Sequence, residues 1–338
     1  MRQAIMIRPG EIEFREIPVP TLKKGQVLIR VRRIGVCGSD VHVQHGKHPF
    51  TPYPVVQGHE FSGVIEKVGK GVTRLRAGMA VTATPQEVCG VCPPCRRGDY
   101  HICDRLKVRG FQAPGCAQEW FVTEAEKIVP LPASFTFEQG ALVEPVAVGV
   151  HSVARAGRLA GRNVAVLGAG PIGNLVGQVA RSQGAKVLIT DISDYRLDVA
   201  ARCGLKAVSN ANTESLAEAS GRVFGKAGFD TAFECAGVEA TLAAAIEIIQ
   251  KGGTIIVVGV FGDHPRVNVG FLQDRELSLV GTLMYQYRDF LKAVRLMKTG
   301  HVVTAPLDSK HFAFADYPAA YAFVDAQADK SMKVFIDL

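Results

Sequence analysis

The segment 163–173, NVAVLGAGPIG, places an apolar run directly before three glycines spaced as G-x-G-x-x-G. Gly168 permits a tight turn, Gly170 lets the backbone approach a pyrophosphate, and Gly173 lets helix and strand pack closely. Backbone amides at the start of the following helix would bind the phosphates. A glycine-rich turn without a ligand gives the same pattern, so the motif needs further support. The candidate cofactor-binding residues of this loop are Gly168, Gly170, Pro171, Ile172 and Gly173.

That support is an acidic residue at the end of the next apolar run, KVLITD. Asp191 lies 18 residues after Gly173, close to the separation of about 20 expected for the residue that binds the adenosine ribose. A carboxylate at this position accepts hydrogen bonds from the ribose hydroxyls and repels a 2′-phosphate, so Asp191 favours NAD. Arg196 follows one turn later and could instead attract a phosphate. We expect Arg196 to flank the adenosine.

Strand-like and helix-like segments alternate through the middle of the chain. Residues 148–282 therefore predict a Rossmann domain, a doubly wound parallel sheet with helices on both faces. Residues 1–147 instead alternate short β-rich runs with glycine-marked turns, which predicts a compact, mostly antiparallel barrel. Residues 283–338 have a less regular pattern. The predicted fold class is α/β, and the predicted limits of its parts are 1–147, 148–282 and 283–338.

The composition argues against membrane and nucleic-acid partners. Hydrophobic residues make up 47% of the 338 residues and charged residues 21%, as in an ordinary globular protein with two domains. The N-terminus lacks a signal-peptide pattern, and polar residues interrupt the longest apolar-leaning run, 163–180. We therefore expect a cytoplasmic protein. The net charge of +7 is scattered along the chain, which favours a solvated surface over a nucleic-acid site.

Four of the eight cysteines fall within fifteen residues, spaced C-x2-C-x2-C-x7-C. Clustered cysteines in a cytosolic chain favour a metal over disulfides. Four thiolates close a tetrahedral zinc shell and leave no position for a substrate, so we predict a structural role. An iron–sulfur cluster is the alternative, but the spacing does not match the ferredoxin patterns. The predicted ligands are Cys89, Cys92, Cys95 and Cys103.

A second group of potential ligands lies near the start of the chain, in the stretches CGSDVH and GHE. A catalytic zinc ion needs about three protein ligands and one exchangeable position. Cys37 and His59 are suitable ligands in glycine-flanked turns, and either Glu60 or Glu144 could complete the shell. Asp40 would orient His59 by accepting the proton of its second ring nitrogen.

These motifs follow one another as they do in zinc-dependent medium-chain dehydrogenases. The stretches GVCGSD, GHEFSGVIEKVG, EPVAVGVH and GAGPIG, together with the four-cysteine loop, carry a resemblance that covers essentially the whole chain. The sequence looks most like the sorbitol (polyol) dehydrogenase branch, because Glu144 stands where other alcohol dehydrogenases have a third cysteine ligand. The resemblance implies a GroES-like catalytic domain, a Rossmann domain, and a segment 283–338 that returns to the catalytic domain. It also implies an active site in the cleft between the domains and a homodimer or homotetramer.

The resemblance implies that NAD oxidises a secondary alcohol to a ketone, with one catalytic and one structural zinc ion per chain. Zinc lowers the pKa of the substrate hydroxyl. Ser39 would pass the proton through the nicotinamide ribose to His42, unless His42 is only a surface histidine. We expect Glu60 to bind the metal directly, because a second direct carboxylate would make the site negative and weaken this acidification. Glu144 would then hold the zinc-bound water or a substrate hydroxyl.

The expected substrate is a small alcohol such as a polyol, a sugar or a cyclic polyol. Polyol dehydrogenases carry an Arg–Tyr pair in the returning segment. Here Tyr285 matches the tyrosine, whereas Met284 replaces the arginine and Arg288 is out of register. We therefore expect sorbitol to be a poor substrate. The alternatives are a sugar-phosphate or L-threonine dehydrogenase of the same family and, in another class, a non-catalytic dinucleotide-binding protein. A non-catalytic protein should have lost the zinc ligands, which this chain retains.

Overall fold

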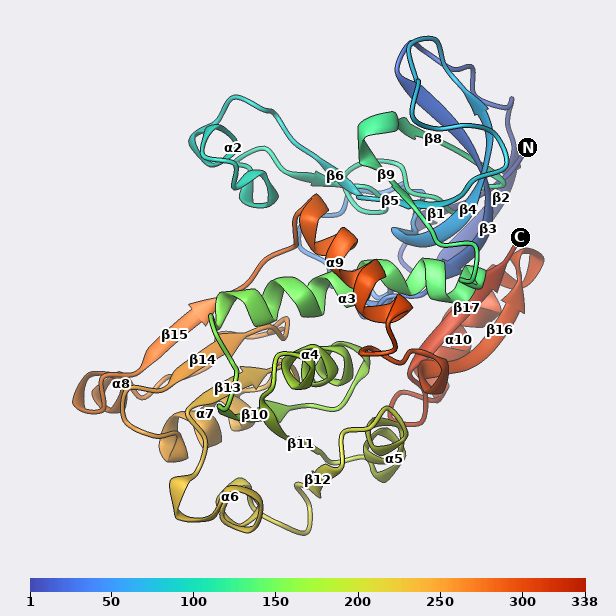
Figure 1. Ribbon diagram of the computed structural model, residues 1–338. Coiled ribbons are helices and arrows are strands. Elements are labelled where there is room, and N and C mark those ends of the chain that lie inside the picture. Colours follow the sequence, from blue (N-terminus) through green and yellow to red (C-terminus); the bar gives the residue numbers. More distant parts are fainter. The chain divides into compact units, whose positions relative to one another are not determined.

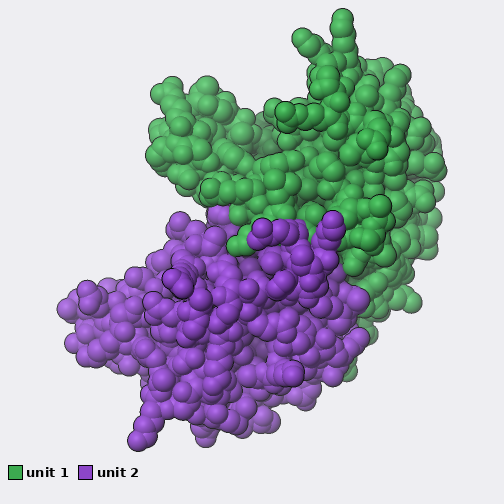
Figure 2. All heavy atoms as spheres, in the orientation of Figure 1, with its two compact units in different colours: residues 1–144, 286–294, 308–338 green, residues 145–285, 295–307 purple.

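The computed structural model describes residues 1–338 (Figure 1), and the chain forms two compact units (Figure 2). Unit 1 consists of residues 1–144, 286–294 and 308–338, and unit 2 consists of residues 145–285 and 295–307. We expected limits at 147/148 and 282/283 and one returning segment over 283–338. The first limit instead lies at 144/145, and residues 283–285 and 295–307 belong to unit 2. The physical reason for 295–307 is the buried side chain of Gln178, which donates to the Val303 carbonyl at 3.0 Å and accepts from the Val303 N–H at 2.7 Å.

Unit 2 is built on a six-stranded parallel sheet with the strand order β12-β11-β10-β13-β14-β15. The strand order reverses between β10 and β13, and dinucleotides bind at such a point beyond the carboxyl ends of the strands. The strands are β10 (Asn163–Leu167), β11 (Lys186–Asp191), β12 (Ala207–Asn210), β13 (Thr231–Glu234), β14 (Thr254–Val257) and β15 (Ser278–Gly281). The helices are α4 (Pro171–Ser182), α5 (Asp194–Arg202), α6 (Leu216–Phe224), α7 (Glu239–Ile248) and α8 (Val269–Asp274). The predicted Rossmann architecture is confirmed.

Unit 1 contains a seven-stranded sheet that is antiparallel except for the parallel pair β16 and β17 at one edge. Its path is β16-β17-β3-β4-β5-β9, and β8 also pairs with β3. The strands are β3 (Gln26–Gly35), β4 (Glu60–Val68), β5 (Ala80–Ala83), β8 (Trp120–Glu124), β9 (Ile128–Pro130), β16 (Asp308–Ala313) and β17 (Lys333–Asp337). Two two-stranded antiparallel sheets complete the unit: β1 (Arg2–Arg8) with β2 (Glu11–Glu16), and β6 (Gln86–Glu87) with β7 (Lys107–Val108).

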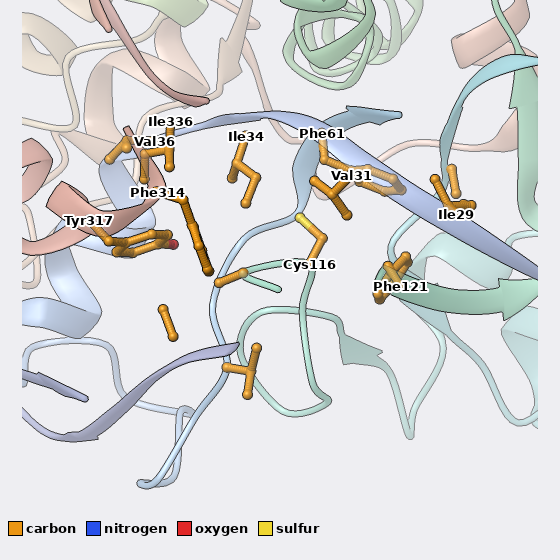
Figure 3. Packing of buried hydrophobic residues seen from close by; sticks show 14 of the residues in the cluster. Ile29, Val31, Ile34, Val36, Phe61, Cys116, Phe121, Phe314, Tyr317 and Ile336 are labelled. Atoms are coloured by element: carbon orange, nitrogen blue, oxygen red, sulfur yellow. The ribbon is translucent and has the colours of Figure 1, made fainter. Parts of the chain in front are cut away.

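The core of unit 1 joins strands from both ends of the chain (Figure 3). Ile34 of β3, Phe61 of β4 and Ile336 of β17 are all at most 2% exposed, so their packing holds the C-terminal strand against the N-terminal sheet. The helices that contribute residues to unit 1 are α1 (Gly38–Gln44), α2 (Pro93–Arg96), α3 (Phe137–Arg155), α9 (Tyr287–Lys298) and α10 (Tyr317–Ala326). None of the helices has the length and apolar character that a membrane crossing requires.

The end of β3 positions the first metal-ligand candidates. Gly35 pairs with Glu60 on one side and with Phe335 on the other. A Cβ atom at Gly35 would lie only 2.5 Å from Glu60 Oε2, so the close approach of the Glu60 carboxylate requires a glycine here. Cys37 follows two residues later as the N-cap of α1.

Candidate active site and metal centres

The structure brings Cys37, His59 and Glu60 together. Their potential ligand atoms all lie within 4.8 Å of one another. His59 is 6% exposed and Glu60 only 1%. A thiolate, an imidazole and a carboxylate form a zinc donor set with three protein ligands, which suits a catalytic centre. Glu144 is not part of this group, so the geometry favours Glu60 over Glu144 as the third ligand.

Asp40 lies between the Cys37 turn and His59. Its Oδ2 accepts a hydrogen bond from the Cys37 N–H at 3.0 Å, which stabilises the first turn of α1. Its Oδ1 is 3.6 Å from His59 Nδ1, and both of these buried atoms lack a hydrogen-bond partner. This separation is longer than a hydrogen bond. Asp40 is thus placed beside His59 as expected, but without the expected hydrogen bond.

The electrostatics of the group reflect the mutual burial of an imidazole, a thiol and a carboxylate. Burial lowers the pKa of His59, but the Asp40 carboxylate and the contact with Cys37 outweigh burial and raise the pKa well above its usual value. Burial raises the pKa of the Cys37 thiol, and the Glu60 carboxylate adds to this effect. A divalent cation favours a thiolate and a neutral imidazole. The donor set therefore fits a zinc ion.

The sequence analysis missed Lys333, which is only 3% exposed. Its Nζ donates to the Glu60 carboxylate and, at 2.9 Å, to the Val36 carbonyl oxygen. Lysine is almost always exposed, and nothing in the stretch SMKVFID marks this one as buried. Only the pairing of β17 with β3 reveals its position.

The predicted proton-transfer residues share a face of α1. Ser39 is half-buried and His42 is exposed, and residues three apart on a helix are neighbours. Glu144 lies on α3 and is 4% exposed. Its charge acts on Lys333, whose pKa is lowered by burial but raised overall by Glu60, Cys37 and Glu144. Glu144 is therefore close enough to act electrostatically on Lys333 beside the metal group, which consists of Cys37, His59 and Glu60, but it is not one of these three residues.

An aromatic side chain borders the metal group. The rings of Phe111 and His59 have centroids 4.9 Å apart, and His48 stacks on Phe111 at 4.8 Å with an interplanar angle of 14°. Burial and the nearby His42 lower the pKa of His48. The sequence analysis left His48 as a structural or surface residue by default, and neither Phe111 nor His48 belongs to a motif.

The four cysteines of the second cluster also lie together, with ligand atoms within 4.8 Å of one another. The Sγ atom of Cys103 is 3.6 Å from that of Cys89 and 3.8 Å from that of Cys92. A tetrahedron with Zn–S bonds of about 2.3 Å has edges of about 3.8 Å. A hydrogen bond from the Val91 backbone is the main cause that lowers the pKa of Cys89 to about 6. The cluster therefore fits a closed zinc site.

Gln286 and Tyr287 hold the cysteine lobe, which is the loop 89–103 that carries these four cysteines. Gln286 Nε2 donates to the Gly98 carbonyl at 3.1 Å and lies 3.0 Å from His101 Nδ1. The backbone N–H of Tyr287 donates to the Tyr100 hydroxyl at 2.7 Å. The lobe is thus linked directly to the segment 286–294, which follows the predicted substrate residue in the sequence.

The predicted substrate residue Tyr285 is only 1% exposed and lies in unit 2. Met284 before it has a φ angle of +52°, which is uncommon for a residue other than glycine. Arg288 is exposed on α9. The substrate role of Tyr285 stays a prediction.

The glycine loop of unit 2 has the geometry that its motif requires. Gly168 has a φ angle of +102°, and a Cβ at Gly173 would lie 1.8 Å from the Gly168 carbonyl oxygen. A Cβ at Gly170 would meet no atom within 4 Å, so this position leaves room for a ligand to approach. Gly170 is the N-cap of α4 and supplies no side-chain cap, and the half-buried Pro171 and Ile172 follow it. The first turn of α4 therefore fits a phosphate group.

Asp191 ends β11 next to this loop. Its Oδ2 accepts from the Ala169 N–H at 2.7 Å and its Oδ1 from the Ser193 N–H at 2.9 Å. Arg196 Nη1 is 3.9 Å from Oδ2. Because each carboxylate oxygen can accept more than one hydrogen bond, Asp191 can hold the loop and still accept from a ribose. Arg196 flanks this carboxylate.

A surface groove of about 460 Å³ in unit 1 contains none of these candidate residues. It is lined by residues that include Lys24, Thr73, Arg74 and Glu124. Its side chains carry charges of both signs and include no cysteine or histidine. We therefore assign the chemistry to the ligand clusters and not to this groove.

Comparison with known proteins identifies the family. The model of the alcohol dehydrogenase GroES-like domain matches residues 23–133, and that of the zinc-binding dehydrogenase matches residues 171–299. The chain is 35% identical to 2-dehydro-3-deoxy-L-galactonate 5-dehydrogenase of Pseudoalteromonas atlantica, over 93% of this chain and 92% of that protein. It is 33% identical to sorbitol dehydrogenase of Halalkalibacterium halodurans, over 97% of each protein.

Solved structures share the whole fold. Galactitol-1-phosphate dehydrogenase from Escherichia coli is 28% identical, with a TM-score of 0.92 and all of both chains covered. A zinc-binding dehydrogenase from Sinorhizobium meliloti 1021, bound to NADP, is 27% identical with a TM-score of 0.91, and the match covers 100% of this chain and 99% of that one. An alcohol dehydrogenase from Escherichia coli CFT073, complexed with NADH, is also 27% identical, with a TM-score of 0.92 and the same coverage.

These matches confirm the predicted fold class, enzyme class and cofactor types, zinc and a nicotinamide dinucleotide. The non-catalytic reading is not favoured, because the ligand sets are complete. The chain therefore belongs to the zinc-dependent medium-chain dehydrogenase family, in its polyol dehydrogenase branch, and is a zinc-containing oxidoreductase.

Proposed function

We propose that this enzyme uses NAD to interconvert a secondary alcohol of a polyol or sugar-derived substrate and the corresponding ketone. The observation that carries the proposal is the convergence of Cys37, His59 and Glu60 within 4.8 Å. These three residues would hold a zinc ion and leave a coordination position for the substrate oxygen. The bound ion supplies Lewis-acid chemistry, which lowers the pKa of the substrate hydroxyl.

The residues around the site have separate roles in this proposal. Asp40 holds the Cys37 turn and lies against Nδ1 of His59, which leaves Nε2 of His59 for the metal. Ser39 would accept the proton from the substrate hydroxyl, and the exposed His42 on the same face of α1 would release it to water. Glu144 would hold water or a substrate hydroxyl.

The cofactor preference would be set by Asp191. Related structures hold either NADH or NADP, so the fold alone does not decide between them. The Asp191 carboxylate, held beside the glycine loop by two backbone amides, would accept from the ribose and repel a 2′-phosphate. This arrangement supports NAD.

The substrate would be less polar at one end than sorbitol, because Met284 replaces the arginine of the polyol dehydrogenase pair. Tyr285 would contact a substrate hydroxyl. The relative named for 2-dehydro-3-deoxy-L-galactonate supports a sugar acid as a second candidate.

The test is a panel of polyols, cyclic polyols, sugar acids, sugar phosphates and threonine, assayed for NADH formation and ranked by kcat/KM. We expect a cyclic or less hydroxylated secondary alcohol or a sugar acid to rank above sorbitol. Sorbitol as the best substrate would refute the inference from Met284. No NADH formation from any compound by zinc-loaded enzyme would count against the proposed function.

We also propose that the enzyme is a homodimer, paired through the edge of the unit 2 sheet. Strand β15 is the last strand in the sheet order, and its outer edge has unpaired backbone groups. Apolar side chains are exposed on and near this edge: Leu279 (38%), Leu283 (54%), Phe271 (39%) and Val269 (66%). Light scattering should show a dimer in the wild type and a monomer in Leu279→Lys.

A cytoplasmic location is also part of the proposal, because both proposed metal sites need reduced thiols.

A further inference from the structure

The C-terminal strand β17 places a buried lysine against the ligand group of the catalytic centre. Lys333 Nζ donates to the Glu60 carboxylate and to the carbonyl oxygen of Val36, the residue before Cys37. We propose that Lys333 is a positioning residue that restrains Glu60 and limits the negative charge that this carboxylate gives to the catalytic metal. The inference rests on the proposed function, because it assumes that Cys37, His59 and Glu60 hold the ion.

The Glu60 carboxylate is confined on two sides. Its Oε2 accepts from Lys333, and the same oxygen lies where a Cβ at Gly35 would approach to 2.5 Å. One carboxylate oxygen is therefore engaged by an ammonium group, so a metal ion would share Glu60 with Lys333. Without the lysine, both oxygens would be available to the ion, and the carboxylate would keep its full charge for it.

Attachment of β17 to the sheet does not require this ammonium group. Backbone pairing joins Phe335 to Gly35 and Ile336 to Ile34, and the Val36 N–H donates to the Val334 carbonyl at 2.9 Å. These β17 side chains are at most 1% exposed and bury apolar surface on folding. An apolar residue at position 333 would pack here without the cost of burying a charge. A role in packing alone therefore does not explain a lysine.

The surrounding charges do explain it. Four groups near the site are anionic when a metal is bound: the Cys37 thiolate and the carboxylates of Glu60, Glu144 and Asp40. With a divalent cation their formal charge sums to −2, and Lys333 reduces it to −1. A more negative shell binds a cation more tightly but makes it a weaker acid toward the substrate hydroxyl. Lys333 would thus lower zinc affinity and favour acidification of the substrate.

This reasoning predicts opposite changes in affinity and catalysis for Lys333→Met. Chelator competition should show zinc at the Cys37–His59–Glu60 site bound about 10-fold more tightly, while kcat/KM at neutral pH falls about 10–100-fold, the usual scale for groups that touch metal ligands. The pH at which kcat/KM reaches its plateau should rise. Lys333→Arg keeps the charge and should resemble the wild type in all three measurements.

The matched control is Lys330→Met, the same substitution at an exposed lysine three residues earlier. It should leave zinc affinity and the pH profile unchanged. Thermal unfolding with zinc present identifies any variant that fails to fold. If Lys333→Met does not fold, Lys333→Gln, a polar replacement that also removes the charge, carries the test with the same expected changes. A Lys333→Met enzyme that loses zinc affinity, or that keeps the wild-type pH profile, overturns the inference. A wild type that binds zinc at this site but oxidises no alcohol would defeat the proposed function, while the affinity comparison would still test Lys333.

Discussion

The substitution of Asp191 tests how the enzyme recognises its cofactor. Asp191 is 8% exposed, and its carboxylate accepts two backbone hydrogen bonds, from Ala169 at 2.7 Å and from Ser193 at 2.9 Å. We expect it to accept at least one more from the ribose. A hydrogen bond to a charged group contributes about 1.5–3 kcal/mol, and about 1.4 kcal/mol corresponds to a factor of ten. Loss of the ribose contact should therefore lower kcat/KM for NAD by roughly 10–100-fold.

Two substitutions separate recognition from loop stability. Asp191→Ala removes both backbone acceptors, so it should also lower the free energy of unfolding by about 1.5–3 kcal/mol for each lost bond. Asp191→Asn keeps the shape and one acceptor oxygen but removes the charge, so it should lose selectivity with less loss of stability. The control is Asp194→Asn, an exposed acidic residue in the first turn of α5 that contacts Asn210 and not the glycine loop.

The assay is kcat/KM with NAD and with NADP at one fixed alcohol concentration, together with the melting temperature of each variant. The NAD-to-NADP ratio should fall roughly 10–100-fold in both Asp191 variants and stay unchanged in Asp194→Asn. A wild type that uses NADP as well as NAD, or an unchanged ratio in Asp191→Ala, would refute the assignment. A fall in NADP use in Arg196→Ala would instead indicate that Arg196 attracts the phosphate.

Three further predictions concern the metal sites and pH. Cys95→Ser should lower the melting temperature or prevent assembly, because a closed thiolate site contributes folding energy. Cys37→Ser should instead stay folded, bind NAD and be nearly inactive. Equal losses of melting temperature in both variants, with activity surviving in Cys37→Ser, would reverse the two roles. Glu144→Gln should keep about two zinc ions per chain but turn over about 10–100-fold more slowly, and complete loss of the catalytic zinc would contradict its indirect role. Burial lowers the pKa of His311, but hydrogen bonds to Asp308 and Asp337 raise it overall above 6.5. The stabilising effect of this ion pair should therefore be present below about pH 6.5 and lost as pH rises through the raised pKa. Urea unfolding of His311→Gln against the wild type should show a difference in stability at pH 5 that shrinks by pH 8, and a constant difference would argue against this ion pair.

The sequence by itself determined the features that depend on short spacing. Gly168 and Gly173 had to be glycines because one needs a positive φ angle and the other a close backbone approach, and both demands act within six residues. The spacing from Cys89 to Cys103 likewise brings four thiols together through one local loop. The alternation of apolar strands and helices predicted the Rossmann sheet, because each βα unit is a local pattern that repeats along the chain.

Only the tertiary structure decided how distant segments meet. Lys333 reaches Glu60 across 273 residues, and Gln286 reaches Gly98 across 188. The sequence analysis already expected Glu60 to be the direct ligand, and the structure groups Glu60, and not Glu144, with Cys37 and His59. The physical reason is sheet register: Gly35 pairs with Glu60 and with Phe335 at the same point of β3. That register results from the packing of the whole unit 1 core, and no local pattern in the sequence specifies it.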